Sequence, residues 1–278
     1  MGVAKTCRQF FMLARFSFLG AIALLFATIC GSSSAVTLNW GSEPWTAGSL
    51  QNSYNVDPGN AGNDLTVTVS GSTGQLQAEI VAPNPMTPAV TAAFQGGYAN
   101  PQNSLCIATN FANRSQGVTV TVDYSSQYTQ GVRNVSFTIF DVDFSNSSGS
   151  NYQDQIRSIT AVGINGTPIA PTITTSINNV LSGTGLNQVV NGVASTSDLG
   201  AGSGNANVTI SFGANAIRSF TFTYGSGSGT VSDPTYQHIG MSNVVFTPVP
   251  EMNPAFATSL SCIVAMLLAF RHNARRRQ

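Results

Sequence analysis

Charged residues are scarce in this chain of 278 residues, and lysine is almost absent. Only 8% of the residues are charged, and the single lysine is Lys5. Between residues 36 and 250 the cations are four arginines: Arg114, Arg133, Arg157 and Arg218. Ten carboxylates stand against these four arginines, which gives this stretch a net charge of about −6, although the whole chain is formally neutral. An acidic, lysine-free surface excludes nucleic acid as an expected partner.

Cysteine is equally rare, because Cys106 is the one cysteine between residues 36 and 250. An intramolecular disulfide is therefore excluded in this stretch, and its stability must come from buried apolar surface. About 215 residues are enough to build one sizeable core. Cys106 lies between Leu105 and Ile107, a setting typical of a buried small hydrophobic residue.

Catalytic motifs are absent as well. The chain has no Gly-x-Ser-x-Gly elbow, no His-Glu-x-x-His helix and no Cys-His arrangement. His238 is the one histidine between residues 36 and 250, and a lone histidine beside a strand is typical of a hydrogen-bonded or surface residue. We therefore expect that the protein is not an enzyme, and a surface hydrolase is the least favoured class.

The N-terminus has the three parts of a secretory signal peptide. Cationic residues come first, an apolar stretch follows over residues 16–29, and Ser33-x-Ala35 fits a small-residue cleavage site. We expect residues 1–35 to be a signal helix that is removed, so that the mature, exported chain begins at Val36.

The C-terminus also has three parts, over residues 249–278. A short segment, residues 249–254, begins with Val249, Pro250 and Glu251. The apolar run 255–270 would be about 24 Å long as a helix, and snorkelling arginines can fit so short a helix into a bilayer. The basic tail over residues 271–278 contains four arginines: Arg271, Arg275, Arg276 and Arg277. This order predicts a transmembrane helix with the basic tail in the cytoplasm.

These residues together resemble the PEP-CTERM sorting signal of Gram-negative bacteria. Val249, Pro250 and Glu251 match its Val-Pro-Glu-Pro motif, while Met252 stands at the position of the second proline. The resemblance implies processing by an exosortase-like membrane protease and transfer to the cell surface or extracellular matrix. The alternative is an ordinary C-terminal membrane anchor.

Period-two alternation dominates the stretch between the two ends, with β-branched and aromatic residues on one face. The clearest segments are 65–69, 117–124, 135–142, 207–212, 217–224 and 239–246, and shorter ones are 75–81, 105–108, 156–162 and 169–174. The region 176–204 is rich in Asn, Ser and Gly and indicates a long loop or weak hairpin. The pattern predicts an all-β domain over residues 36–248, a β-sandwich of jelly-roll or immunoglobulin-like type.

Three aspartates form a candidate calcium site. Asp141 and Asp143 end a predicted strand, where residues i and i+2 share a face, and Asp154 follows eleven residues later. Calcium prefers six to eight oxygen ligands, which carboxylates and loop carbonyls supply. The alternative is that these aspartates terminate the strand and start a turn, so that no cofactor is needed.

Trp40 and Trp45 lie close together near the start of the domain. Exposed rings would stack on sugars, whereas buried rings would anchor an N-terminal strand to the core. The sequence as a whole favours an exported protein of the cell envelope, with the membrane as a partner and a structural or adhesive role. The alternative is a carbohydrate-binding module that binds extracellular polysaccharide at the cell surface.

Overall fold

The computed structural model describes residues 33–250 except for 81, 99, 101 and 194–201. No helix in this described part is long and apolar enough to cross a membrane. The predicted transmembrane helix and nearly all of the predicted signal peptide lie outside the described residues. So do Glu251 of the predicted sorting motif and the four arginines of the basic tail: Arg271, Arg275, Arg276 and Arg277.

Residues 34–249 form one compact unit that is built from β-strands and three short 3₁₀ turns. The strands are β1 (Val36–Leu38), β2 (Gln51–Tyr54), β3 (Leu65–Gly71), β4 (Ala89–Thr91), β5 (Ser104–Thr109), β6 (Gly117–Tyr124), β7 (Val132–Phe140), β8 (Phe144–Ser147), β9 (Ser150–Gly163), β10 (Pro168–Ile169), β11 (Thr172–Thr175), β12 (Asn179–Ser182), β13 (Val189–Gly192), β14 (Val208–Gly213), β15 (Ile217–Ser226), β16 (Gln237–Met241) and β17 (Val244–Pro248). The 3₁₀ turns are η1 (Thr73–Gln75), η2 (Gly185–Asn187) and η3 (Gly204–Ala206).

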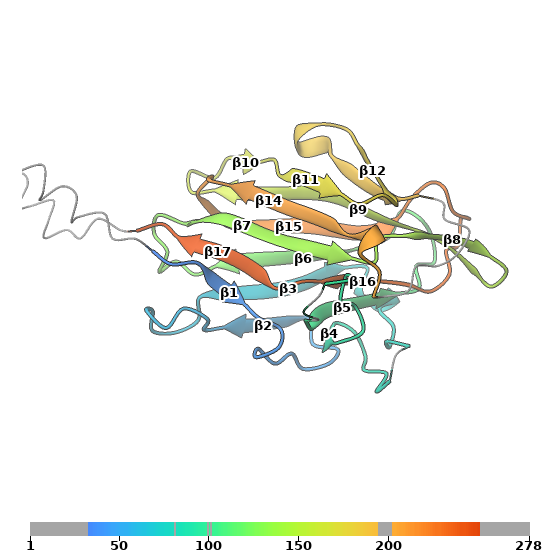
Figure 1. Cartoon of the computed structure of the whole chain (residues 1–278), viewed down its shortest axis with the longest axis horizontal. Helices are drawn as coiled ribbons and strands as arrows, with labels where there is room; N and C mark the ends of the chain where they lie inside the picture. Colours follow the sequence, from blue (N-terminus) through green and yellow to red (C-terminus); the bar gives the residue numbers. More distant parts are fainter. Residues whose placement is uncertain (1–32, 81, 99, 101, 194–201, 251–278) are drawn as a thin grey trace, which may run out of the picture. The chain divides into compact units, whose positions relative to one another are not determined.

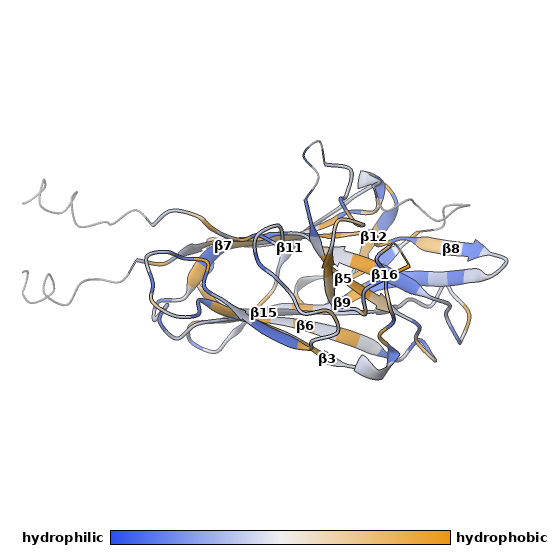
Figure 2. Ribbon diagram, turned by 90° about the horizontal axis from the view of Figure 1, so that it is seen from below, coloured by the Kyte–Doolittle hydropathy of each residue, from blue (hydrophilic) through white to orange (hydrophobic). Residues whose placement is uncertain are grey.

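The strands pair antiparallel in two layers. The first layer has the order β2-β3-β6-β15-β9-β13-β12, with β8 and β10 also paired to β9. The second layer has the order β11-β14-β7, followed by β16 and β17 side by side along β7. Beyond β16 lie β5 and β4, and beyond β17 lies β1. Figure 2 shows β3, β6 and β15 in one layer and β7 and β11 in the other.

Aromatic side chains hold the two layers face to face. Phe137 of β7 stacks on Phe220 of β15 with ring centroids 4.6 Å apart, and on Phe222 at 5.8 Å. The layers are also joined at one corner, where Ile217 pairs with Val132. The residues of the main buried apolar cluster come from all parts of the domain between β1 and β17. A protein that consists of residues 34–249 alone would therefore contain the whole of this core. The expectation of an all-β fold is confirmed, in the form of one sheet that is curled into two facing layers.

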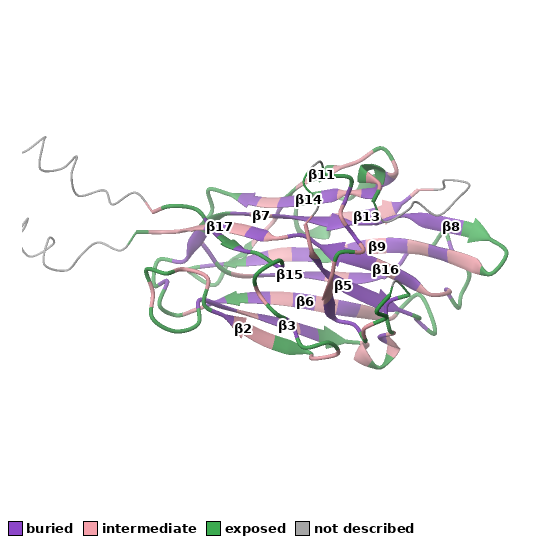
Figure 3. Cartoon of the chain, turned by 60° about the horizontal axis from the view of Figure 1, so that its bottom comes forward, coloured by how far each residue is buried: buried purple, intermediate pink, exposed green. Residues whose placement is uncertain are grey.

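The alternating segments form strands because one face of each is apolar. In β6, Val118, Val120 and Val122 are buried, while the threonines between them are half-buried. Figure 3 shows the same alternation along β6 and β15. The predicted segment 117–124 and the observed strand have the same bounds.

The predicted strand 239–246 is two strands instead of one. Ser242 and Asn243 interrupt it, and the chain exchanges its outer neighbour there from β5 to β1. The side chains of the two interrupting residues accept hydrogen bonds from other segments. The Thr138 amide donates to Ser242 Oγ at 2.8 Å, and the Trp40 amide donates to Asn243 Oδ1 at 2.9 Å.

Two other sequence expectations need correction. Of the predicted strand 75–81, the described residues 75–80 form no strand, but pass through the end of η1 and two isolated bridges. The strand predicted over 135–142 ends at Phe140, because Asp141 adopts a left-handed backbone with φ of 64°. Of the two possibilities for 176–204, a long loop or a weak hairpin, the structure has a hairpin, formed by β12 and β13.

Candidate functional site

A groove of about 300 Å³ lies against the outer face of the second layer. It is lined by residues of β1, β7, β14 and β17, by the interruption between β16 and β17, and by the loop before β5: Thr37, Tyr98, Gln102, Ser136, Phe137, Thr138, Thr209, Ser242, Asn243 and Val245. None of these lining residues is charged. The groove is therefore a neutral surface on an acidic domain.

The floor of the groove follows from the alternation of β7. Phe137 points inward onto the first layer, so its neighbours Ser136 and Thr138 point outward. Thr209 of β14 lies directly opposite Thr138, and their hydroxyls hydrogen-bond at 3.0 Å. The same alternation that fills the core thus places a row of hydroxyl groups on the outer face.

Tyr98 forms part of the wall of the groove. Its hydroxyl donates to Thr138 Oγ1 at 3.1 Å, its ring packs edge-on against Phe140, and the residue is 40% exposed. Gly96 and Gly97 before it both have a left-handed backbone, with φ of 59° and 68°. A Cβ on Gly96 would lie 2.3 Å from the Phe140 ring, so only glycine allows this loop to bring Tyr98 to the groove.

The groove is lined by polar side chains without a charge, although Thr138 and Ser242 are buried and their hydroxyls bond to other groups of the protein. Its hydroxyl and amide side chains match a ligand that is itself rich in hydroxyl groups, and the Tyr98 ring adds an apolar contact. Sequence analysis missed this site, because the lining residues come from six separate segments. The available signal was the Ser and Thr on the outward positions of β7 and β14.

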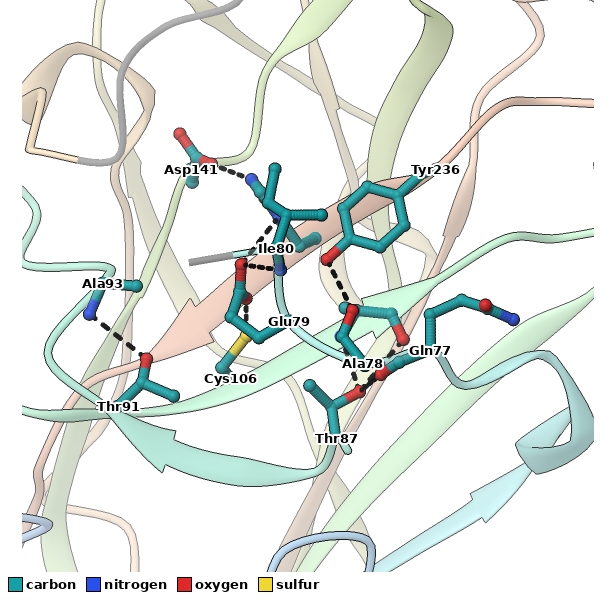
Figure 4. A network of polar contacts seen from close by, with 12 residues as sticks. Gln77, Ala78, Glu79, Ile80, Thr87, Thr91, Ala93, Cys106, Asp141 and Tyr236 are labelled. Carbon is teal, nitrogen blue, oxygen red and sulfur yellow. Dashed lines mark hydrogen bonds and ion pairs between the residues drawn. The ribbon is translucent and has the colours of Figure 1, made fainter. Parts of the chain in front are cut away.

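A second polar cluster surrounds His238 on β16. Its Nε2 lies 3.2 Å from Asp141 Oδ2, and its Nδ1 lies 3.8 Å from Glu79 Oε1. The Cys106 thiol donates to the other Glu79 oxygen at 2.7 Å. Figure 4 shows the Glu79 carboxylate beside the Cys106 sulfur, with Asp141 and Tyr236 on either side. The His238 side chain is only 13% exposed.

This cluster holds the segment around Glu79 in place. It does not contain a reactive thiolate. Burial raises the pKa of Cys106 well above its ordinary value, and the Glu79 carboxylate raises it further. The thiol is thus protonated at neutral pH, and a protonated thiol is a poor nucleophile. Burial and Glu79 also raise the pKa of Tyr236. Glu79 therefore ties the segment before β4 to β5 and β16.

The three aspartates of the predicted calcium site lie close enough to influence one another, but Asp141 and Asp154 have different side-chain partners. Asp141 contacts His238, whereas Asp154 is fully buried and accepts from the Tyr224 hydroxyl at 2.6 Å and the Asp143 amide at 3.1 Å. The premise that Asp141 and Asp143 share a strand face is wrong, because the strand ends before Asp141. No group of three metal-ligating residues is found among the described residues. Calcium binding stays a prediction, which a chelator-dependent melting temperature would test.

Trp40 and Trp45 are both buried. The Trp40 indole donates to the Ser242 carbonyl at 2.8 Å, and its ring packs edge-on against Trp45 and Tyr54. This is the arrangement that the anchoring interpretation describes. Neither ring is placed to stack on a sugar unless it leaves the core.

The predicted sorting motif begins where the domain ends. Val249 follows β17 directly, and its amide donates to the Gly131 carbonyl at 3.0 Å. Pro250 is exposed. Because β1 pairs with β17, the first and last strands of the domain lie side by side.

Comparisons with known proteins give only remote similarities. No family model and no curated protein matches the chain. A carbohydrate-binding module specific for non-crystalline cellulose is 9% identical, with a TM-score of 0.34, and the match covers 64% of this chain and 89% of that one. A family 11 carbohydrate-binding module from Clostridium thermocellum, in complex with a mixed-linked tetrasaccharide, is 10% identical, with a TM-score of 0.28, and the match covers 80% and 99% of the two chains.

The N-terminal domain of an adhesin from Streptococcus gordonii is also 10% identical, with a TM-score of 0.30, and the match covers 66% of this chain and 42% of that one. These scores are too low to transfer a ligand or a function. The interpretation of the groove therefore depends on its own residues.

Asp154 provides a test of the buried acid cluster. Burial raises its pKa well above the ordinary value, and the Asp143 carboxylate raises it further, although the Tyr224 hydrogen bond acts in the opposite direction. The folded state therefore binds this proton more tightly than the unfolded state. The stability that Asp154 contributes is present at low pH and is lost as pH rises through the raised pKa.

We predict that Asp154→Asn makes the free energy of unfolding less dependent on pH above about 4, the ordinary range of an aspartate. Urea unfolding of residues 34–249 at a series of pH values measures this. Asp233→Asn, at an exposed carboxylate, is the control because it makes the same change in net charge. Equal pH dependence in Asp154→Asn and the parent would contradict the prediction.

Proposed function

We propose that this chain is an exported cell-surface protein whose β-domain binds a neutral polysaccharide in the groove beside Tyr98. One observation carries the proposal: the groove is open, uncharged and lined by hydroxyl and amide side chains, with a partly exposed aromatic ring on its wall. Saccharides present hydroxyl groups for hydrogen bonding and C–H faces for contact with aromatic rings.

The charge of the domain determines which saccharide fits. With about −6 net charge and no cation in the groove lining, an anionic polymer would be repelled and would find no counter-charge there. A neutral polymer meets neither obstacle. The volume of about 300 Å³ is at the lower end of the range for small-molecule sites. A groove of this size suits one or two sugar units of a longer chain.

Delivery of the domain is the second part of the proposal, and it depends on the sequence of the two ends. A signal peptide exports the chain, the C-terminal segment holds it at the membrane, and processing at the PEP-CTERM-like motif passes it to the surface or matrix. The role of the domain there is adhesive, and no catalytic step is included. The buried, protonated Cys106 thiol supports a non-catalytic role.

Blocking the groove tests the binding proposal. We predict that Tyr98→Ala weakens binding to neutral polysaccharide about tenfold, equivalent to ~1.4 kcal/mol, because it removes the aromatic contact and one groove hydroxyl. Thr209→Trp should weaken it further by filling the groove. Affinity electrophoresis of residues 34–249 in gels that contain soluble cellulose derivatives, mannan or xylan measures the effect.

The matched control is Thr172→Trp. Thr172 is exposed on β11 in the same layer but does not line the groove. The proposal is contradicted if the polysaccharide in the gel slows the migration of Thr172→Trp and Thr209→Trp to the same extent. It is also contradicted if none of the neutral polymers slows the parent. Polygalacturonate serves as the anionic probe, and we expect no retardation by it.

Sorting is tested in the whole chain in its native cells. We predict that replacing Pro250 and Glu251 by alanine leaves the protein uncut in the membrane fraction, because the processing motif is lost. Cell fractionation and sequencing of the mature C-terminus measure this, with Asn253→Ala as a neighbouring control. A mutant processed as efficiently as the control would overturn the sorting assignment and leave the binding proposal intact.

A further inference from the structure

One side of the domain is formed by edge strands that carry no charge. β10, β11 and β12 lie together along the upper side of Figure 1. They belong to a run of forty residues, 158–197, that contains no Asp, Glu, Lys or Arg. This run supplies the strand at one side of each layer: β12 in the first and β11 in the second.

β12 is an edge strand of the first layer, at the end opposite β2. Within the described residues its one paired neighbour is β13, so its second edge has no strand beside it. Val180 is 48% exposed and Leu181 is 36% exposed. Since consecutive side chains of a strand point to opposite faces, β12 presents apolar surface on both faces. Ile177, just before β12, is 81% exposed.

Charge and proline, two usual protections of an edge strand, are absent from β12, which is a short strand of four residues. Sheet edges are commonly guarded by lysine, by inward-pointing charges or by proline, which prevent pairing with another chain. Proline lies within β10 at Pro168 and just before β11 at Pro171, so these two edges are guarded. The segment 172–193, which holds β12 and β13, contains neither proline nor charge.

Charge indicates which partner would pair there. Two copies of a domain with about −6 net charge repel each other wherever their carboxylates approach. The uncharged side is where this repulsion is weakest, and it offers no counter-charge that would select a charged partner. Antiparallel pairing of an edge strand with its own copy is also compatible with two-fold symmetry. If residue i of one molecule contacts residue j of the other, then residue j of the first molecule contacts residue i of the second.

We infer that β12 pairs antiparallel with β12 of a second copy of this chain. The pairing joins the first layers of two molecules into one continuous sheet, and the exposed apolar side chains of β12 pack against their copies across the junction. This inference is independent of what the groove binds.

Charge reversal on β12 tests the pairing. Sedimentation velocity of residues 34–249 over a series of concentrations should show a monomer–dimer equilibrium for the parent. Val180→Lys should shift the equilibrium to monomer, because like charges would meet across the junction. Val180→Thr, which keeps a β-branched, uncharged residue, is the matched control and should dimerise within about threefold of the parent.

A more specific test of the pairing mixes two variants of opposite charge. Val180→Lys and Val180→Glu should each be monomeric alone and form a heterodimer together, because opposite charges then face each other. Circular dichroism and a melting curve check that each variant is folded, and Ser182→Lys, at another exposed position of β12, replaces Val180→Lys if that variant fails to fold. A monomeric parent, a Val180→Lys variant that dimerises like the parent, or a mixture that stays monomeric would each overturn the inference.

Discussion

The packing of aromatic rings between β7 and β15 is the interaction on which the rest of this structure depends. The described part of the chain has no disulfide, and its one cysteine, Cys106, is a buried thiol, so the two layers are held by apolar contact. Phe137 can stack on Phe220 only if its neighbours Ser136 and Thr138 face outward. The floor of the groove is therefore a direct consequence of how the core is filled.

Local alternation explains how far the sequence could predict the fold. β3, β6 and the part of β15 from Phe220 to Tyr224 have buried apolar residues at every second position, and this pattern predicts their segments. The division of the last strand at Ser242 and Asn243 was not predictable, because the hydrogen bonds that compensate for it come from Thr138 and Trp40, far away in sequence. For Trp40, the sequence favours burial over exposure without identifying the residues against which the ring packs.

The candidate sites were less predictable than the strands for the same reason. Tyr98 stands in a loop without periodicity, and nothing near it in sequence reveals that Thr138 and Thr209 will lie beneath its hydroxyl. The acid cluster shows the opposite error: Asp141 and Asp143 are close in sequence, yet the strand ends before Asp141, whose backbone is left-handed and whose carboxylate contacts His238. Pairing of distant strands decides both cases, and a local pattern contains little information about it.

The groove and the β12 edge share one physical property, which connects the two proposals. Both are uncharged areas on a domain of about −6 net charge, so both are places where an uncharged partner approaches without desolvating a charge. The groove holds a single exposed aromatic ring, Tyr98, and a sugar bound there as proposed would be held weakly. A dimer through β12 would carry two grooves, and two weak sites on one polymer bind far more tightly than either alone, provided that the polymer spans them. Self-pairing at the edge is thus the means by which a small, neutral groove would become an effective adhesive surface.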